Sequence, residues 1–133
     1  MLKLNNTIKV MVPTKDNNGE AIDYMPMIQG VTNLVGGSTM YNAQGLWVDG
    51  GKTYNDSNKL VEFNVNDATA YRALVRVMND IVYPLLHEGG HQLAVWLQVN
   101  GTTFILDKGT VGETLEVAKA LTVEALAIEK YRL

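Results

Sequence analysis

The chain has 133 residues, 47% hydrophobic and 19% charged, a balance typical of one folded domain rather than a disordered segment. The net charge is −3 and the basic residues are scattered, which argues against duplex nucleic acid as a partner. The lack of cysteine excludes disulfides and cysteine-based zinc sites. There is no signal-peptide pattern and no apolar run of the roughly 18 residues that cross a membrane, so we expect a soluble protein of the cytoplasm.

The first predicted elements are a strand and a helix. Apolar residues alternate along Thr7–Val12, which is the period of a strand. Lys15–Gly19, rich in Asn, Asp and Gly, predicts a turn. A helix is then expected from about Asp23 to Val35, where apolar residues recur at helical spacing and two glycines follow.

Two further strands are predicted in the middle of the chain. Ser38–Asp56 is strand-like on both sides of a turn at Asp49–Gly51, and Gly45 suggests a bulge. Lys59–Val65 alternates again, with Val61, Phe63 and Val65 on one face.

The clearest helix of the sequence follows, capped by Asn66 or Asp67. Pro84 lies late in it and is expected to kink it or begin its end. Its apolar stripe consists of Tyr71, Leu74, Val75, Met78, Ile81, Val82 and Leu85.

The last third predicts a hairpin and a helix. Leu93–Leu106 has two apolar arms around Asn100-Gly101, a pair favoured in type I′ turns. A single helix is expected over Glu113–Tyr131, and its buried stripe would be Val117, Ala118, Leu121, Ala125 and Ile128.

The order β-α-β-β-α-β predicts an α+β fold, a ferredoxin-like sandwich, with an added β-hairpin arm and a C-terminal helix. We expect one domain, with residues 1–108 forming the sandwich and residues 109–133 a helix for packing or oligomerisation. The side chains expected to face the two helices are Ile8, Val10, Val12, Val61, Phe63, Val65, Leu93, Val95, Leu97 and Val99.

The opposite face of the predicted sheet mixes charged side chains with large apolar ones. Lys9 and Glu62 would share it with Met11, Leu60 and Trp96. An apolar surface of this kind is usually covered, either by the terminal helix or by a second subunit. We therefore expect a homo-oligomer, and the interface residues that the pattern suggests are Met11, Leu60, Trp96, Leu121 and Ile128.

The stretch HEGGH, His87 to His91, matches the H-E-x-x-H pattern of zinc peptidases. In a metal site His87 and His91 would bind zinc, Glu88 would act as base and Glu113 would be a third ligand. That geometry requires a helix through Gly89-Gly90, where each glycine costs about 1 kcal/mol relative to alanine. A strand is predicted directly afterwards, so we favour a helix end, without a metal.

Two other groups suggest a ligand site. Arg72 and Arg76 lie four residues apart and could bind an anion, although an Arg76–Asp80 pair on a solvated helix face is the simpler interpretation. Trp47, Tyr41 and Tyr54 lie around the glycine-rich second strand region and could stack on a flat ligand, although core or interface packing is commoner for such aromatics.

The segments VPTKDNNG, GGSTMYNAQGLWVDGGK and KLVEFNV resemble a loose group of small bacterial and bacteriophage proteins. In that group a strand ending in V-P-T-K leads, through a helix, to a G-G-x-T…G-x-W segment and another strand. The resemblance covers about Ile8 to Val65. It implies the fold and a phage or prophage source, and it implies no chemistry.

Together these features favour a small, non-enzymatic, self-associating protein without a cofactor. By this interpretation it is a phage accessory factor that binds a host protein or sequesters a small anionic, nucleotide-like ligand in the host cytoplasm. One alternative is a zinc-dependent hydrolase using HEGGH. Another is a structural component of the virion.

Overall fold

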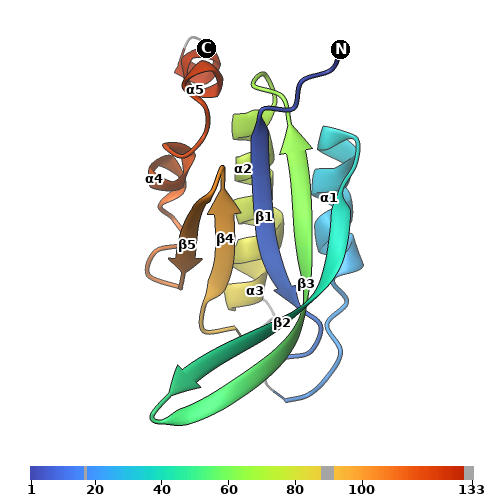
Figure 1. Cartoon of the computed structure of the whole chain (residues 1–133), viewed down its shortest axis with the longest axis vertical. Coiled ribbons are helices and arrows are strands. Elements are labelled where there is room, and N and C mark those ends of the chain that lie inside the picture. Colours follow the sequence, from blue (N-terminus) through green and yellow to red (C-terminus); the bar gives the residue numbers. More distant parts are fainter. Residues whose placement is uncertain (17, 88–91, 131–133) are drawn as a thin grey trace.

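The protein is built on one antiparallel sheet of five strands, in the spatial order β2-β3-β1-β4-β5 (Figure 1). The computed structural model describes residues 1–16, 18–87 and 92–130. The first four strands have the order of the predicted ferredoxin-like sandwich, and β5 adds the second strand of a hairpin at one edge. The predicted fold class is confirmed. In chain order the strands are β1 Asn6–Pro13, β2 Thr39–Asp49, β3 Lys52–Val65, β4 Val95–Val99 and β5 Thr102–Leu106.

The crossover helices lie behind the sheet in Figure 1, and no helix of the described residues covers its front face. They are α1 Met25–Val35 and a longer rod made of α2 Ala70–Val77, η1 Met78–Val82 and α3 Tyr83–His87. In the part of the chain that the structure describes, none of the helices combines the length and the apolar character that a membrane crossing requires.

The rod contains a π-helical turn, η1, where the sequence predicts a disturbance by Pro84. Proline has no N–H, so Pro84 cannot donate a hydrogen bond to the carbonyl of Asp80, four residues earlier. The backbone widens just before it, and the N–H of Tyr83 donates to the carbonyl of Met78, five residues earlier. The disturbance at Pro84 is thus a wider turn within a helix that continues to His87.

The sheet face toward the helices holds the core. Nine of the ten side chains predicted to point there are buried: Ile8, Val10, Val12, Val61, Phe63, Val65, Val95, Leu97 and Val99. The prediction for Leu93 is wrong, because this side chain is 81% exposed. Pairing of β4 with β5 begins only at Val95, opposite the last residue of β5, so Leu93 precedes the sheet.

Both predicted tight turns are present. Asn100 and Gly101 have φ of 47° and 87°, and Gly50 and Gly51 have φ of 58° and 75°. Two successive positive φ values are the geometry of a type I′ turn, which matches the twist of the strands it joins. These turns set the register of the β2–β3 and β4–β5 hairpins.

The C-terminal part forms two short helices, α4 Thr114–Ala118 and α5 Val123–Lys130, so the prediction of one helix over Glu113–Tyr131 is wrong. Both helices pack against α2. The break lies at Thr122, whose hydroxyl accepts a hydrogen bond from the N–H of Ala125 at 3.1 Å and so caps α5.

A polar cluster around the buried side chain of Asn6, here called the Asn6 network, attaches this C-terminal part to the sheet. Asn6 is fully buried; its amide N–H donates to Asp67 Oδ1 at 2.8 Å. Its Oδ1 accepts from the N–H of Thr122 at 3.0 Å and from the amide of Asn100 at 3.1 Å. The Thr122 hydroxyl donates to the same carboxylate oxygen of Asp67 at 2.5 Å. Three separate connecting segments, which contain Asp67, Asn100 and Thr122, therefore meet at the side chain of Asn6.

Candidate functional site

The uncovered sheet face carries a band of large apolar side chains that crosses all five strands. Leu60 of β3 pairs with Tyr41 of β2 on one side and with Met11 of β1 on the other. On the other half of the sheet, Trp96 of β4 pairs with Ile105 of β5. The β1–β4 register joins the halves, because Lys9 pairs with Gln98 and the antiparallel direction brings Met11 beside Trp96. We call these five side chains the apolar band.

The apolar band is in contact with water at both ends. Tyr41 is 48% exposed and Ile105 is 63% exposed, whereas Met11, Leu60 and Trp96 are half-buried by their neighbours. An apolar patch that remains accessible to water is a feature typical of a contact site for another molecule.

A polar strip runs beside the band and contains an ion pair. Lys9 Nζ lies 3.6 Å from Glu62 Oε1, and both side chains are partly shielded from water. The second carboxylate oxygen of Glu62, Oε2, accepts a hydrogen bond from the side-chain amide of Asn64 at 3.0 Å. The side-chain Oδ1 of Asn64 in turn accepts one from the Thr7 hydroxyl at 3.0 Å. The carboxylate is held by these partners next to Leu60, in the middle of the sheet.

The structure brings together three of the five predicted interface residues, Met11, Leu60 and Trp96. The prediction for Leu121 is corrected, because only 4% of its surface is exposed and it belongs to the core of its own chain. Ile128 is partly exposed on α5, which packs against α2 behind the sheet. Ile105 also belongs to the band and was missed by sequence reasoning, although the strand alternation places it on that face. Tyr41, which the sequence suggested as a ligand-stacking ring, lies at the other end of the band.

Trp47 and Tyr54 lie on the part of the β2–β3 hairpin that projects beyond the body of the protein, at the bottom of Figure 1. Their rings stack with centroids 4.4 Å apart and planes 17° apart. The Trp47 indole N–H donates to Asp56 Oδ2 at 2.7 Å, and Lys52 Nζ lies 5.9 Å from the Tyr54 ring centre. Both rings remain accessible to water. We call residues 45–56 the arm.

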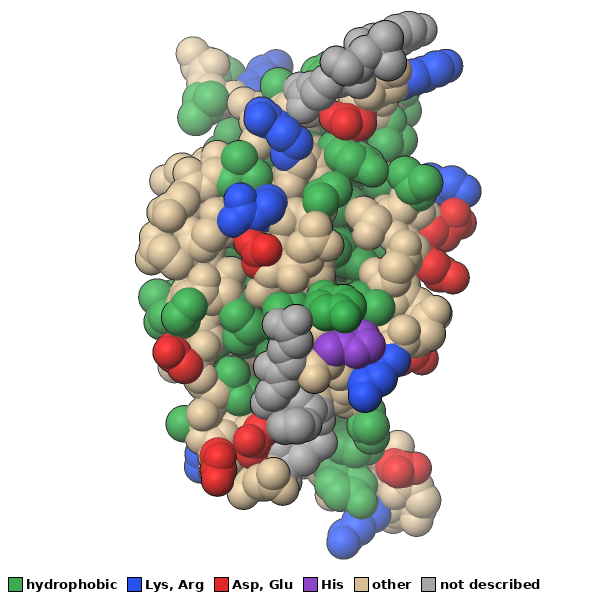
Figure 2. Space-filling model, turned by 180° about the vertical axis from the view of Figure 1, so that it is seen from behind, with side chains coloured by type: hydrophobic (Ala, Val, Ile, Leu, Met, Phe, Trp, Pro, Cys, Tyr) green, Lys and Arg blue, Asp and Glu red, His purple; other side chains and the backbone are tan. Residues whose placement is uncertain are grey.

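Arg72 and Arg76 lie on α2, behind the sheet, so the structure does not unite them with the aromatic pair of the arm. Arg76 Nε bonds Asp80 Oδ2 at 2.7 Å, as the simpler interpretation expects. Figure 2 shows this side of the molecule, where charged side chains of both signs are scattered rather than gathered. The geometry gives the arginines no shared anion site with Trp47 and Tyr54.

The Arg76–Asp80 pair is expected to matter little for stability. Replacing Asp80 with asparagine should lower the free energy of unfolding by less than about 0.5 kcal/mol, because water screens a partly exposed pair. Urea denaturation of both proteins measures this. A decrease of the free energy of unfolding by more than about 1.5 kcal/mol would contradict this expectation and show that the pair contributes substantially to stability.

Most of the HEGGH stretch on which the metal hypothesis rests lies outside the described residues, namely Glu88, Gly89, Gly90 and His91. His87 ends α3, with its ring stacked on Tyr83 at 4.3 Å between centroids, and Glu113 is the N-cap residue of α4. Gln92 and Leu93 are not helical, so the α3 helix does not extend to Leu93. Among residues 1–16, 18–87 and 92–130, no three His, Asp or Glu side chains are grouped closely enough to hold a metal ion.

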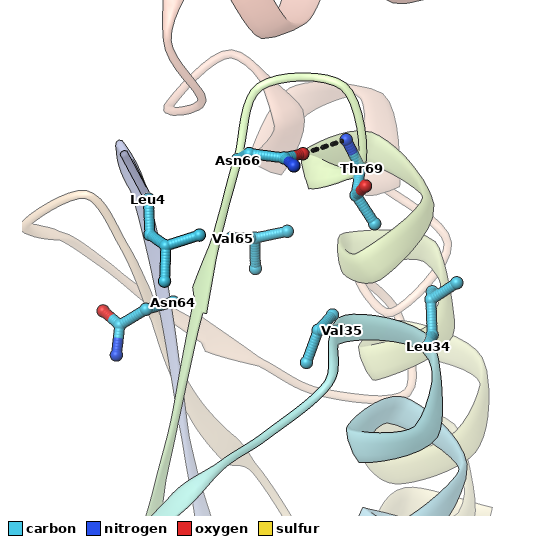
Figure 3. Close-up of a pocket in the computed structure, with 7 residues that line it drawn as sticks. All are labelled: Leu4, Leu34, Val35, Asn64, Val65, Asn66 and Thr69. Carbon is cyan, nitrogen blue, oxygen red and sulfur yellow. Dashed lines mark hydrogen bonds between the residues drawn. The ribbon is translucent and has the colours of Figure 1, made fainter. Parts of the chain in front are cut away.

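A small cavity lies between the end of α1 and the start of α2 (Figure 3). Its volume is about 50 Å³, which has room for very few water molecules. Asn66 at its rim accepts a hydrogen bond from the N–H of Thr69 at 2.9 Å. A drug-sized ligand needs several hundred Å³, so this cavity is not a site for one. It is lined by Leu4, Leu34, Val35, Asn64, Val65, Asn66 and Thr69.

No protein-family model and no curated protein matches this sequence. Among solved structures, the chain is similar to a phage SAM lyase in complex with S-methyl-5′-thioadenosine, with a TM-score of 0.57 and 5% sequence identity. The similarity covers 80% of this chain and 92% of that chain. At this identity the likeness shows a shared fold, which extends over nearly the whole of the neighbour.

Proposed function

We propose that this is a self-associating, phage-encoded protein that binds a small nucleoside-like ligand at the uncovered face of its sheet. The observation that carries the proposal is the apolar band, which crosses the whole sheet beside the Lys9–Glu62 pair. The resemblance to phage proteins, the net charge of −3 and the scatter of the basic residues along the sequence support action in the host cytoplasm rather than on duplex nucleic acid.

Self-association follows from the cost of leaving the band in water. Burial of apolar surface contributes about 25 cal/mol per Å², and Trp96, Tyr41 and Ile105 offer large side chains for this purpose. A second copy supplies the same band, and two identical surfaces in contact are related by a two-fold axis. The C-terminal helices cannot provide the cover, because they pack against α2 behind the sheet.

A ligand site at this face also requires a second chain. Small-molecule sites enclose most of their ligand, and the face of a single sheet provides one wall only. The aromatic ring of Tyr41 or of Trp96 could stack on a base, and the Glu62 carboxylate, in the polar strip beside the band, could accept hydrogen bonds from ribose hydroxyls. The similarity in fold to a protein that binds S-methyl-5′-thioadenosine supports this class of ligand.

The proposed self-association is tested by placing a charge in the band. Wild type is expected to exceed its monomer mass of 14.6 kDa in light scattering at micromolar concentration. Leu60→Lys should weaken association at least tenfold, because a lysine is costly to bury without a partner. Leu115→Lys, at an exposed apolar position of α4, is the matched control and should behave as wild type. A wild-type protein that is monomeric throughout would overturn the proposal.

The ligand is tested separately with S-methyl-5′-thioadenosine as the probe, by calorimetric titration. Trp96→Ala and Glu62→Gln are each expected to weaken binding at least tenfold, because the first removes a stacking surface and the second a charged acceptor. Leu115→Lys again serves as control. Absence of binding by an oligomeric wild type would reject this ligand class and leave self-association standing.

A second candidate is a lyase that acts on S-adenosylmethionine. It is favoured by the fold shared with a phage SAM lyase and by a carboxylate, Glu62, on the uncovered face. Chromatography of S-adenosylmethionine after incubation with the protein distinguishes it from a binding protein. Product formation that Glu62→Gln abolishes would favour the lyase, and unchanged substrate would favour binding alone.

A further inference from the structure

The edge strand β2 lacks the features that usually protect a sheet edge. It has eleven residues, contains no lysine or proline, and its only charged residue is the last, Asp49. Within residues 1–16, 18–87 and 92–130 it pairs with β3 alone, so no described strand lies on the other side of its backbone. The opposite edge, β5, has only five residues. Long, uncharged edges are templates for pairing with another strand.

We infer that β2 pairs antiparallel with β2 of a second copy, centred on Gln44, so that each copy's arm lies beside the other copy's apolar band. The inference rests on the proposed self-association and adds, beside the contact through the apolar band, a contact at the edge of β2 with a defined register.

The β2–β3 hairpin determines which backbone groups face outward. A two-residue turn, Gly50-Gly51, closes on a hydrogen-bonded pair, Asp49 with Lys52, and hydrogen-bonded and non-bonded pairs then alternate. The pair of Gln44 with Ser57 is therefore non-bonded, and the N–H and C=O of Gln44 point away from β3. Ser57 agrees with this assignment, because its carbonyl faces β1 and accepts from the N–H of Thr14 at 3.1 Å.

The sequence of β2 is nearly symmetric about Gln44, which selects the register. With Gln44 opposite its copy, the small residues Ala43 and Gly45 face each other, and so do the aromatic residues Tyr41 and Trp47. The aliphatic residues Met40 and Val48 form the next pair out. In this register, each residue whose N–H and C=O point away from β3 lies opposite another such residue, so the two β2 strands can exchange backbone hydrogen bonds.

This register also provides a neighbour for the exposed aromatic pair of the arm. Tyr54 stacks on Trp47, and Trp47 would lie opposite Tyr41 of the second copy, where that copy's apolar band begins. A row of large side chains would then run from one copy's arm across the other copy's sheet. Tyr41 and Trp47 come from different chains at this point, so the second copy contributes two aromatic rings to the proposed ligand face. A projecting two-stranded hairpin is marginally stable in water by itself, and the pairing supports it.

The test uses Gln44→Pro. Proline removes an N–H that points away from β3, so the hairpin within the chain should persist while pairing between chains is blocked. Sedimentation equilibrium is expected to show at least tenfold weaker dimerisation than wild type. Gln44→Ala, which keeps the N–H, is the matched control and should dimerise within threefold of wild type. Circular dichroism of both variants checks that the fold is retained.

A charge exchange at the same position gives an independent readout. Gln44→Lys and Gln44→Glu each place like charges opposite each other at the two-fold axis and should dimerise several-fold more weakly than wild type. An equimolar mixture should restore dimerisation as a mixed pair. If Gln44→Pro and both charged variants associate as wild type does, the inference is overturned. If the Gln44 variants associate normally and Leu60→Lys dissociates, the proposed self-association through the apolar band stands without this inference. If Gln44→Pro dissociates and Leu60→Lys does not, the edge of β2 rather than the sheet face holds the copies together.

Discussion

Replacing Asn6 with alanine is expected to lower the free energy of unfolding by about 2–3 kcal/mol. The change removes three hydrogen bonds of a fully buried side chain: the bond to Asp67 and those from Thr122 and Asn100. Buried groups left without a partner cost about 1–3 kcal/mol each, reduced where water can enter.

The loss should be visible first in the C-terminal part, because Asn6 and Asp67 are what hold Thr122. Urea denaturation followed by circular dichroism gives the free energy, and hydrogen exchange shows which segment opens first. Asn55→Ala, at an exposed position of the arm, is the matched control and should change stability by less than about 0.5 kcal/mol. An equally small effect of Asn6→Ala would mean that the network does not fasten the C-terminal helices.

Asp67 is expected to make stability depend on pH in the acid range. The Thr122 hydroxyl and then the Asn6 amide stabilise its carboxylate, and they hold the pKa of Asp67 below its ordinary value of 3.8, against a smaller opposing effect of burial. A folded-state pKa below the unfolded one means that the unfolded state binds protons first. The stabilisation is therefore complete above about pH 4 and is lost as pH falls from 3.8 through the folded-state pKa.

The measurement compares wild type with Asp67→Asn between pH 7 and pH 2. Wild type should be the more stable protein at neutral pH, because bonds to a charged acceptor are stronger than those to a neutral amide. The difference should shrink as pH falls below 3.8, where the carboxyl takes up a proton. Asp49→Asn, at the tip of the arm, controls for the general effect of removing a carboxylate. A wild-type advantage that stays constant to pH 2 would contradict the role of this carboxylate.

Part of the candidate site was accessible to sequence reasoning, since strand alternation alone places Met11, Leu60 and Trp96 on one face. Their assembly into one band depends on which strands are neighbours. Tyr41 and Ile105 complete the band because β2 and β5 occupy the two edges of the sheet. Conversely, Arg76 and Trp47 suggest a shared ligand when only residue types are considered, whereas the structure puts Arg76 on α2, behind the sheet, and Trp47 on the projecting arm.

The sequence by itself determined those features that depend on neighbouring residues. Alternation specifies the strands, Asn100-Gly101 specifies a turn with positive φ, and Pro84 disturbs a helix wherever that helix packs. Only the tertiary structure decided the break at Thr122, because the side chains that hold it, Asn6 and Asp67, come from distant parts of the chain. The same holds for which apolar side chains stay exposed, since burial depends on what packs against a surface as well as on the residue that forms it.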